Sequence, residues 1–268
     1  MALNFSVTLT IDEDVLSDLK GFTLNALKAV ECDPNRTENG NPVIWFSDSG
    51  VSTNQTYEWQ ENLQVYGGTS KVPLAEGVEV SRYDPRDITY GQTLLIQEAN
   101  GHGKVDPQIE GRPGFVTIAT DVDKVSEQII GGCCTYSPIT KKFAPTCAFP
   151  MINHTSFVFK TIQKVLFFFS SKVLSTGSIL YFMTSDAILV DLTNEFNQTI
   201  TFTKNGWKSP KAGRIVKSYE KLTNVLILPN PLAQVEEKEK EKEKEKMERA
   251  EMKISMEKQS GKASEPIV

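Results

Sequence analysis

The chain has 268 residues, of which 39% are hydrophobic and 24% are charged, and its formal net charge at pH 7 is −5. This length allows one large domain or two small ones with a substantial core, and the composition is that of an ordinary globular protein. The acidic balance and the scattered basic residues argue against a nucleic-acid-binding protein.

The N-terminal segment predicts a half-buried strand followed by a short helix. Apolar and polar side chains alternate from Leu3 to Ile11, which is the period of a strand with one buried face. Asp12 is a suitable N-cap and Gly21 a suitable stop signal for a helix over residues 14–20. The chain does not begin with a basic segment and an apolar run. We therefore expect no signal peptide and a cytoplasmic location, with non-standard export as the alternative.

Sequence patterns typical of β-strands recur along the rest of the chain up to about residue 228. Runs of β-branched and aromatic residues are separated by clusters of Gly, Pro, Asn and Asp, which favour turns. The sequence predicts one all-β domain over residues 1–232, a single antiparallel β-sandwich or a barrel-like relative of it. Strands are expected at residues 22–31, 42–47, 57–65, 78–83, 92–97, 115–119, 157–169, 179–192, 199–203 and 222–228.

The most apolar stretch of the chain is Val165–Phe169, bounded by Lys164 and Ser170. A membrane-spanning helix needs about 20 apolar residues, so this stretch is too short to be one. We expect a buried strand here and no transmembrane segment.

The composition changes abruptly after Pro231. Lys and Glu alternate up to Lys246, and residues 247–268 contain few apolar side chains and no aromatic one. If this segment were a helix, its opposite charges at i, i+3 would stabilise it and its like charges at i, i+4 would destabilise it. Each effect is roughly a few tenths of a kcal/mol, so the two nearly cancel. Residues 233–268 are therefore predicted to be a disordered, low-complexity tail or a fraying helix. Such a tail would keep the protein in solution or, in the alternative interpretation, bind a partner protein.

Three of the four cysteines, Cys133, Cys134 and Cys147, lie close together in the chain, and Cys32 lies far upstream. Structural zinc sites usually pair their donors as CxxC or HxxxH, and that spacing is absent. One alternative is a metal site formed by Cys133, Cys147 and His154, and another is a cysteine nucleophile, Cys147, activated by His154. A third is a disulfide from Cys133 or Cys134 to Cys147, which would not persist in a reducing cytosol. We expect buried thiols on strands, no metal and no cofactor.

Other motifs point to turns rather than to chemistry. Gly101–Gly103 lies in a polar loop and does not open a helix, so it is not a phosphate cradle. The acidic pairs in Asp12–Asp14 and Asp121–Asp123 do not continue into an EF-hand loop. The GxSxG elbow of α/β-hydrolases does not occur. The sequence therefore offers no catalytic residue.

The candidate ligand-binding residues are the aromatic residues Trp207, Trp45 and Tyr66. In β-domains most aromatic side chains on strands belong to the core. Trp207 follows the turn-forming pair Asn205–Gly206 and is the most loop-like of the three tryptophans. We expect it to be the exposed one if a tryptophan takes part in binding.

Segments along the body of the chain carry a resemblance: Asn25–Val30, Pro42–Ser47, Tyr57–Glu61, Gly91–Leu94, Cys147–Pro150, Val165–Ser170 and Ile188–Thr193. Together they resemble a loose group of uncharacterised fungal and bacterial β-rich proteins without an assigned activity. The resemblance covers about residues 3–230 and implies a single microbial β-domain. It brings no catalytic motif, so no functional residue follows from it.

These observations favour a non-catalytic binding protein that holds a carbohydrate, lipid or small molecule on a β-scaffold. One alternative is a β-barrel cyclase or isomerase, or an accessory protein, of a secondary-metabolite pathway. In that case Glu58, Glu61 or Asp87 should point into a cavity and titrate abnormally. The other alternative is a membrane-active or self-assembling protein whose apolar strands pair anew. An oligomer is compatible with all three.

Overall fold

The computed structural model describes residues 3–80, 83–123 and 127–230. The described residues up to Leu228 belong to one compact unit. Strands dominate the described residues, and their helices are short: α1 (Glu13–Leu16), the 3-10 helix η1 (Pro34–Asn39) and α2 (Leu222–Leu226). The all-β prediction is confirmed. The predicted tail at 233–268 lies outside the described residues.

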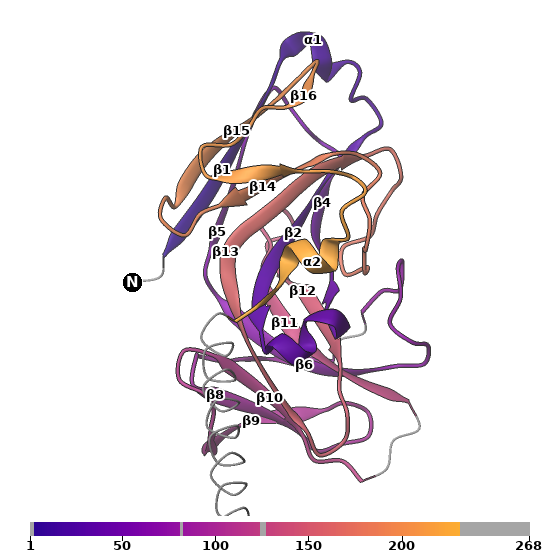
Figure 1. Cartoon of the computed structure of the whole chain (residues 1–268), viewed down its shortest axis with the longest axis vertical. Coiled ribbons are helices and arrows are strands. Elements are labelled where there is room, and N and C mark those ends of the chain that lie inside the picture. Colours follow the sequence, from indigo (N-terminus) through magenta and orange to yellow (C-terminus); the bar gives the residue numbers. More distant parts are fainter. Residues whose placement is uncertain (1–2, 81–82, 124–126, 231–268) are drawn as a thin grey trace, which may run out of the picture. The chain divides into compact units, whose positions relative to one another are not determined.

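The strands of the described residues form three sheets (Figure 1). Sheet A contains β1 (Asn4–Ile11), β5 (Asn54–Gln60), β15 (Asn197–Thr203) and β16 (Gly206–Trp207). Sheet B contains β2 (Thr23–Cys32), β4 (Ile44–Asp48), β8 (Gln92–Ile96), β9 (Gly103–Glu110), β10 (Val116–Thr120), β13 (Ser156–Ser170), β14 (Ala187–Asp191), β17 (Gly213–Val216) and β18 (Ile227–Pro229). Sheet C contains β3 (Asn41–Pro42), β6 (Leu63–Ser70), β7 (Tyr83–Asp87), β11 (Gln128–Tyr136) and β12 (Phe143–Pro150).

The long strands β2 and β13 pair antiparallel and form the centre of sheet B (Figure 1). Their pairing runs from Phe159↔Cys32 to Ser170↔Thr23. The other edge of β13 pairs with β10 near its start and with β14 near its end. The apolar run predicted as a buried strand lies within β13. None of the helices in the described ranges has the length and apolar character that a membrane crossing requires.

Most pairs among the described strands are antiparallel, as predicted, but parallel pairs also occur. Strand β1 pairs in parallel with β15, and β8 pairs in parallel with β10. The first of these pairs joins the N-terminal strand to a segment almost two hundred residues later, Ser6 lying opposite Asn197. A local hydrophobic pattern carries no information about such a partner.

Sheets A and C cover the same face of sheet B. On β2, Leu24 and Ala26 pack into the core cluster shared with sheet A, whereas Val30 and Cys32 pack into the cluster shared with sheet C. Because the side chains of a strand alternate between its faces, these four residues and Lys28 share one face. Lys28 therefore lies at the line where sheets A and C meet. The described sheets stay open, which gives a layered sandwich rather than a closed barrel.

Two predicted segments fold differently from expectation. The helix expected over 14–20 is confined to Glu13–Leu16, and the chain turns after it. Residues 222–226 form helix α2 instead of a strand, because Leu222, Val225 and Leu226 recur at helical spacing and are all buried against sheet B.

Other predicted strands begin or end at different residues in the structure. The segment 57–65 holds the end of β5 and the start of β6, with the chain turning between them at Glu61–Asn62. Within 179–192 only Ala187–Asp191 is a strand, and the described part of 78–83 contributes a single bridge at Glu79 and the start of β7. Strand β9 is largely exposed, so it lacks the apolar alternation by which strands are recognised.

Candidate functional site

The three aromatic residues that the sequence suggested for ligand binding differ in how deeply they are buried. Trp45 and Tyr66 are fully buried. The Nε1 of Trp45 donates to the carbonyl of Thr135 at 3.3 Å, and the hydroxyl of Tyr66 donates to the carbonyl of Cys147 at 2.8 Å. Both rings thus belong to the core and present no surface to a ligand arriving from solvent. Trp207 is half-buried and borders a hollow.

A tight hairpin between β15 and β16 positions Trp207. Thr203 pairs with Gly206, and Phe202 pairs with Trp207. Gly206 has a φ of 91°, which a glycine adopts without the steric penalty of a Cβ. The hydroxyl of Thr203 donates to the carbonyl of Gly206 at 3.1 Å and closes the turn. The turn therefore returns the chain so that the indole contacts Phe169 of sheet B and Phe202 of sheet A.

The hollow beside this indole, here called the Trp207 pocket, has a volume of about 580 Å³. The indole stacks on Phe169 with the ring centroids 5.4 Å apart and the planes at 9°. It meets Phe202 edge-on at 4.9 Å and 71°. Its Nε1 donates to the carbonyl of Asp186 at 3.1 Å, which fixes the orientation of the ring. The apolar walls are Leu19, Phe22, Phe169, Phe202 and Ile215.

An ion pair forms the polar edge of the Trp207 pocket. The Nζ of Lys217 donates to Oδ2 of Asp186 at 2.8 Å, and the amide of Ser218 donates to Oδ1 at 3.1 Å. The hydrogen bond from Lys217 lowers the pKa of Asp186, and the same bond raises the pKa of Lys217. Both groups are therefore charged over the neutral pH range, beside walls that are aromatic and aliphatic.

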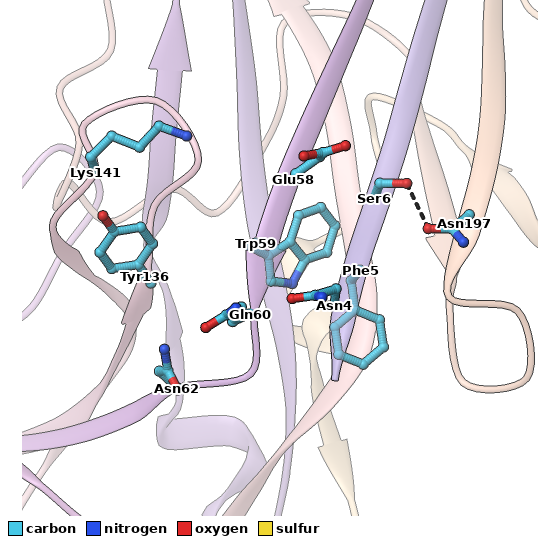
Figure 2. A pocket seen from close by; sticks show the side chains of 10 residues that line it. All are labelled: Asn4, Phe5, Ser6, Glu58, Trp59, Gln60, Asn62, Tyr136, Lys141 and Asn197. Atoms are coloured by element: carbon cyan, nitrogen blue, oxygen red, sulfur yellow. Dashed lines mark hydrogen bonds between the residues drawn. The ribbon is translucent and has the colours of Figure 1, made fainter. Parts of the chain in front are cut away.

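A second hollow, here called the polar cleft, has a volume of about 540 Å³ and lies between sheet A and the turn that joins β11 to β12 (Figure 2). Figure 2 shows Tyr136 and Lys141 on one side, and Trp59 and Glu58 on the other. The cleft is rich in carboxamide side chains, which come from Asn4, Gln60, Asn62 and Asn197. Each carboxamide offers both a donor and an acceptor, so the lining suits a neutral polar ligand.

Glu58, Glu61 and Asp87 are the carboxylates expected to point into a cavity in an enzyme. They do not line the same hollow. Glu58 lines the polar cleft, whereas Glu61 and Asp87 line a neighbouring hollow of about 560 Å³. Glu61 accepts a hydrogen bond from Gln163 at 2.7 Å, and Asp87 accepts one from Gln64 at 2.9 Å. Their partners are thus neutral amides, and the three acids do not converge on one point.

A buried cation lies close to Trp59, one of the residues that line the polar cleft. Lys28 is 1% exposed, and within the described residues its Nζ has no hydrogen-bond partner. The Nζ lies 5.1 Å from the ring centroid of Trp45 and 5.7 Å from that of Trp59. Burial lowers the pKa of Lys28 to about 8, although the negative charges of Glu61 and Cys133 act in the opposite direction. The two indole faces add cation–π contacts to this electrostatic stabilisation of the ammonium group.

Of the residues considered for a metal site, His154 does not join the two cysteines. Among the described residues, no group of three or more His, Cys, Asp or Glu side chains is arranged to hold a metal ion. His154 lies on the surface, with Nδ1 3.3 Å from a carboxylate oxygen of Asp121 and Nε2 3.6 Å from one of Asp123. Cys133 and Cys147, by contrast, are fully buried.

Sequence reasoning missed Lys28 and most of the two hollows. The signal for Lys28 was present, because it occupies the inward position between Ala26 and Val30 on an otherwise apolar strand face. No comparable signal marked Asp186 or Lys217, since they are thirty-one residues apart and only the β14–β17 pairing brings them together.

Comparison of the chain with protein-family models, with curated proteins and with solved structures found no match.

Proposed function

We propose that the protein binds a small molecule with a flat, largely apolar body in the Trp207 pocket, and that it acts by binding rather than by catalysis. The observation that carries this proposal is the half-buried indole of Trp207, stacked on Phe169 beside a hollow of about 580 Å³. Small-molecule sites generally have about 300–1,000 Å³, mostly apolar and aromatic walls, and a few polar groups that fix orientation. The Trp207 pocket has each of these properties.

The polar edge restricts the ligand further. Asp186 and Lys217 neutralise each other, so an incoming charged group competes for one of them. Lys217 is the more exposed partner and has the longer, more flexible side chain. We therefore propose a ligand whose ring system carries an anionic or strongly polar group facing Lys217. A microbial secondary metabolite is one source of such a molecule.

The test uses the aromatic sulfonate 1-anilinonaphthalene-8-sulfonate as a probe with the full-length protein. Trp45 and Trp59 are buried, so acrylamide quenching of tryptophan fluorescence reports mainly on Trp207. We expect saturable one-to-one binding that protects Trp207 from acrylamide, and at least a tenfold weaker affinity in Trp207→Ala. The matched control is Tyr136→Ala in the polar cleft, which should bind the probe like the parent protein. Equal affinity of Trp207→Ala and the parent would refute the proposal.

A second candidate function is suggested by the polar cleft. Four carboxamides together with Ser6, Tyr136 and one charge of each sign match the hydroxyl groups of a saccharide (Figure 2). Calorimetric titration with neutral oligosaccharides should then give binding that Gln60→Ala weakens and Trp207→Ala leaves intact. The opposite dependence would assign the sugar to the Trp207 pocket instead.

A further inference from the structure

Cys133 and Cys147 face each other across an antiparallel strand pair inside sheet C. They are register partners on β11 and β12, and their Sγ atoms lie 3.3 Å apart. All four cysteines of the chain are thiols in the structure. A disulfide requires an S–S distance of about 2.0 Å, so the two sulfur atoms need to approach by only about 1.3 Å.

A β-bulge brings a third side chain to this pair. Cys133 pairs with Cys147 and Cys134 pairs with Pro145, so β12 carries Thr146 as an extra residue at this point. The hydroxyl oxygen of Thr146 lies 3.1 Å from Sγ of Cys133. Cys133 therefore contacts two polar groups of the opposite strand, although all three side chains are fully buried.

The surroundings make the two sulfur atoms chemically unequal. Burial alone raises the pKa of Cys133, but hydrogen bonds with Cys147 and Thr146 and the positive charge of Lys28 bring it below its ordinary value. Burial, together with the hydrogen bond and the charge of Cys133, raises the pKa of Cys147 well above its ordinary value. Thiolate character is thus concentrated on Cys133, with a thiol at contact distance.

We propose that Cys133 and Cys147 form a redox modification site in which a peroxide converts the two facing thiols into a cross-strand disulfide. The Cys133 thiolate attacks the peroxide oxygen and gives a sulfenic acid, with release of hydroxide. The Cys147 sulfur then attacks the sulfenic sulfur, and the S–O bond breaks. For hydrogen peroxide the balance is two thiols and one H₂O₂ giving one disulfide and two waters.

The geometry also explains why the other two cysteines stay outside this reaction. Cys134 follows Cys133 directly on β11, so its side chain points to the opposite face of sheet C, where it packs with Tyr66 and Ile130. Burial and the charge of Asp33 raise the pKa of Cys32 to about 12, which suppresses its thiolate. Cys134 is therefore a matched control that has the same burial and the same tryptic peptide as Cys133.

The experiment exposes the native full-length protein to hydrogen peroxide, removes the peroxide with catalase, and alkylates the remaining thiols in denaturant. We expect two alkylated cysteines instead of four and a linked tryptic peptide pair that contains Cys133 and Cys147. Dithiothreitol should restore all four thiols. Because the pair is buried, a bulky aromatic disulfide reagent should react with it far more slowly than peroxide does.

Variants separate this mechanism from nonspecific oxidation. Cys134→Ala should form the disulfide at the parental rate, whereas Cys147→Ala should form none and should yield a dimedone adduct at Cys133. Lys28→Met should slow the oxidation at neutral pH severalfold, and an unchanged rate would overturn the part assigned to Lys28. Four remaining thiols after native treatment, or a disulfide that uses Cys32 or Cys134, would overturn the proposal as a whole.

Discussion

The ammonium nitrogen of Lys28 lies 5.1 Å from the ring centroid of Trp45, at the line where sheets A and C meet over sheet B. Trp59 meets Trp45 edge-on at 5.2 Å and 84°, so the two indoles form two sides of a corner around the cation. A buried charge without a hydrogen-bond partner destabilises a fold, and cation–π contacts offset only part of that effect. The buried charge of Lys28 therefore lowers the free energy of unfolding of the protein.

Replacing Lys28 by Met should stabilise the protein at neutral pH. The pKa of Lys28 is about 8 in the folded protein and 10.5 for an ordinary lysine, and this difference corresponds to about 3 kcal/mol at about 1.36 kcal/mol per pH unit. Methionine keeps the length of the side chain and removes the buried charge. Urea denaturation of the parent and Lys28→Met at pH 7 measures the difference in the free energy of unfolding.

The pH dependence of that difference checks its cause. Below pH 8 both folded and unfolded chains carry the proton on Lys28, so the penalty is fully present. Between about pH 8 and 10.5 the unfolded chain binds more protons at this position, so the parent gains stability as pH rises. The advantage of Lys28→Met should therefore shrink over this window and vanish above it. A constant difference across the window would exclude burial of the charge as the reason.

The ion pair at the edge of the Trp207 pocket should be visible in the titration of Asp186. Its hydrogen bond from Lys217 lowers the pKa of the carboxyl group. Replacing Lys217 by Met should return this pKa towards the ordinary aspartate value, measured by carbon-detected NMR of the side-chain carboxyl. Because Asp186 is ionised more readily in the fold, its contribution to stability is present above the unfolded pKa and is lost as pH falls through the folded pKa. Lys211→Met, which interrupts the separate pair with Glu195, should leave the Asp186 titration unchanged.

The buried hydroxyl of Tyr57 donates to Oδ2 of Asp48 at 2.9 Å, and Gln55 donates to the same oxygen at 2.7 Å. Tyr57→Phe should lower the free energy of unfolding by about 2 kcal/mol, because a hydrogen bond to a charged group is lost in the interior. Tyr90→Phe is the matched control, since the Tyr90 hydroxyl shares a hydrogen bond with the neutral hydroxyl of Thr161 and its loss should cost about 1 kcal/mol. Equal losses in the two variants would contradict the assigned role of the Asp48 carboxylate.

Gly213 fixes the start of β17 and thereby the position of Ile215 and Lys217 beside the Trp207 pocket. Its φ is 124°, and a Cβ at this position would lie 1.9 Å from the carbonyl oxygen of Leu189. Gly213→Ala should therefore destabilise the protein by about 3 kcal/mol or more and weaken probe binding. Gly114→Ala provides the comparison, because Gly114 has a φ of 77° with open space around it, and only the backbone strain of about 1 kcal/mol applies.

The sequence by itself determined the local class of structure in much of the chain. Alternation from Leu3 to Ile11 predicted β1, and the apolar run at Val165–Phe169 predicted part of β13, because the faces of a strand have a period of two wherever one side is buried. The pair Asn205–Gly206 marked the turn that leaves Trp207 accessible, because positive φ favours glycine. Such signals depend on neighbouring residues only.

The tertiary structure alone decided which segments meet. The parallel pairing of β1 with β15, the placing of Lys28 between two indoles, and the contact of Asp186 with Lys217 join residues that are distant in the chain. The buried thiols were expected, but the 3.3 Å approach of Cys133 to Cys147 follows from strand register and from the extra residue Thr146 in β12. Register and bulges are set by the packing of whole sheets, so composition and periodicity do not encode them locally.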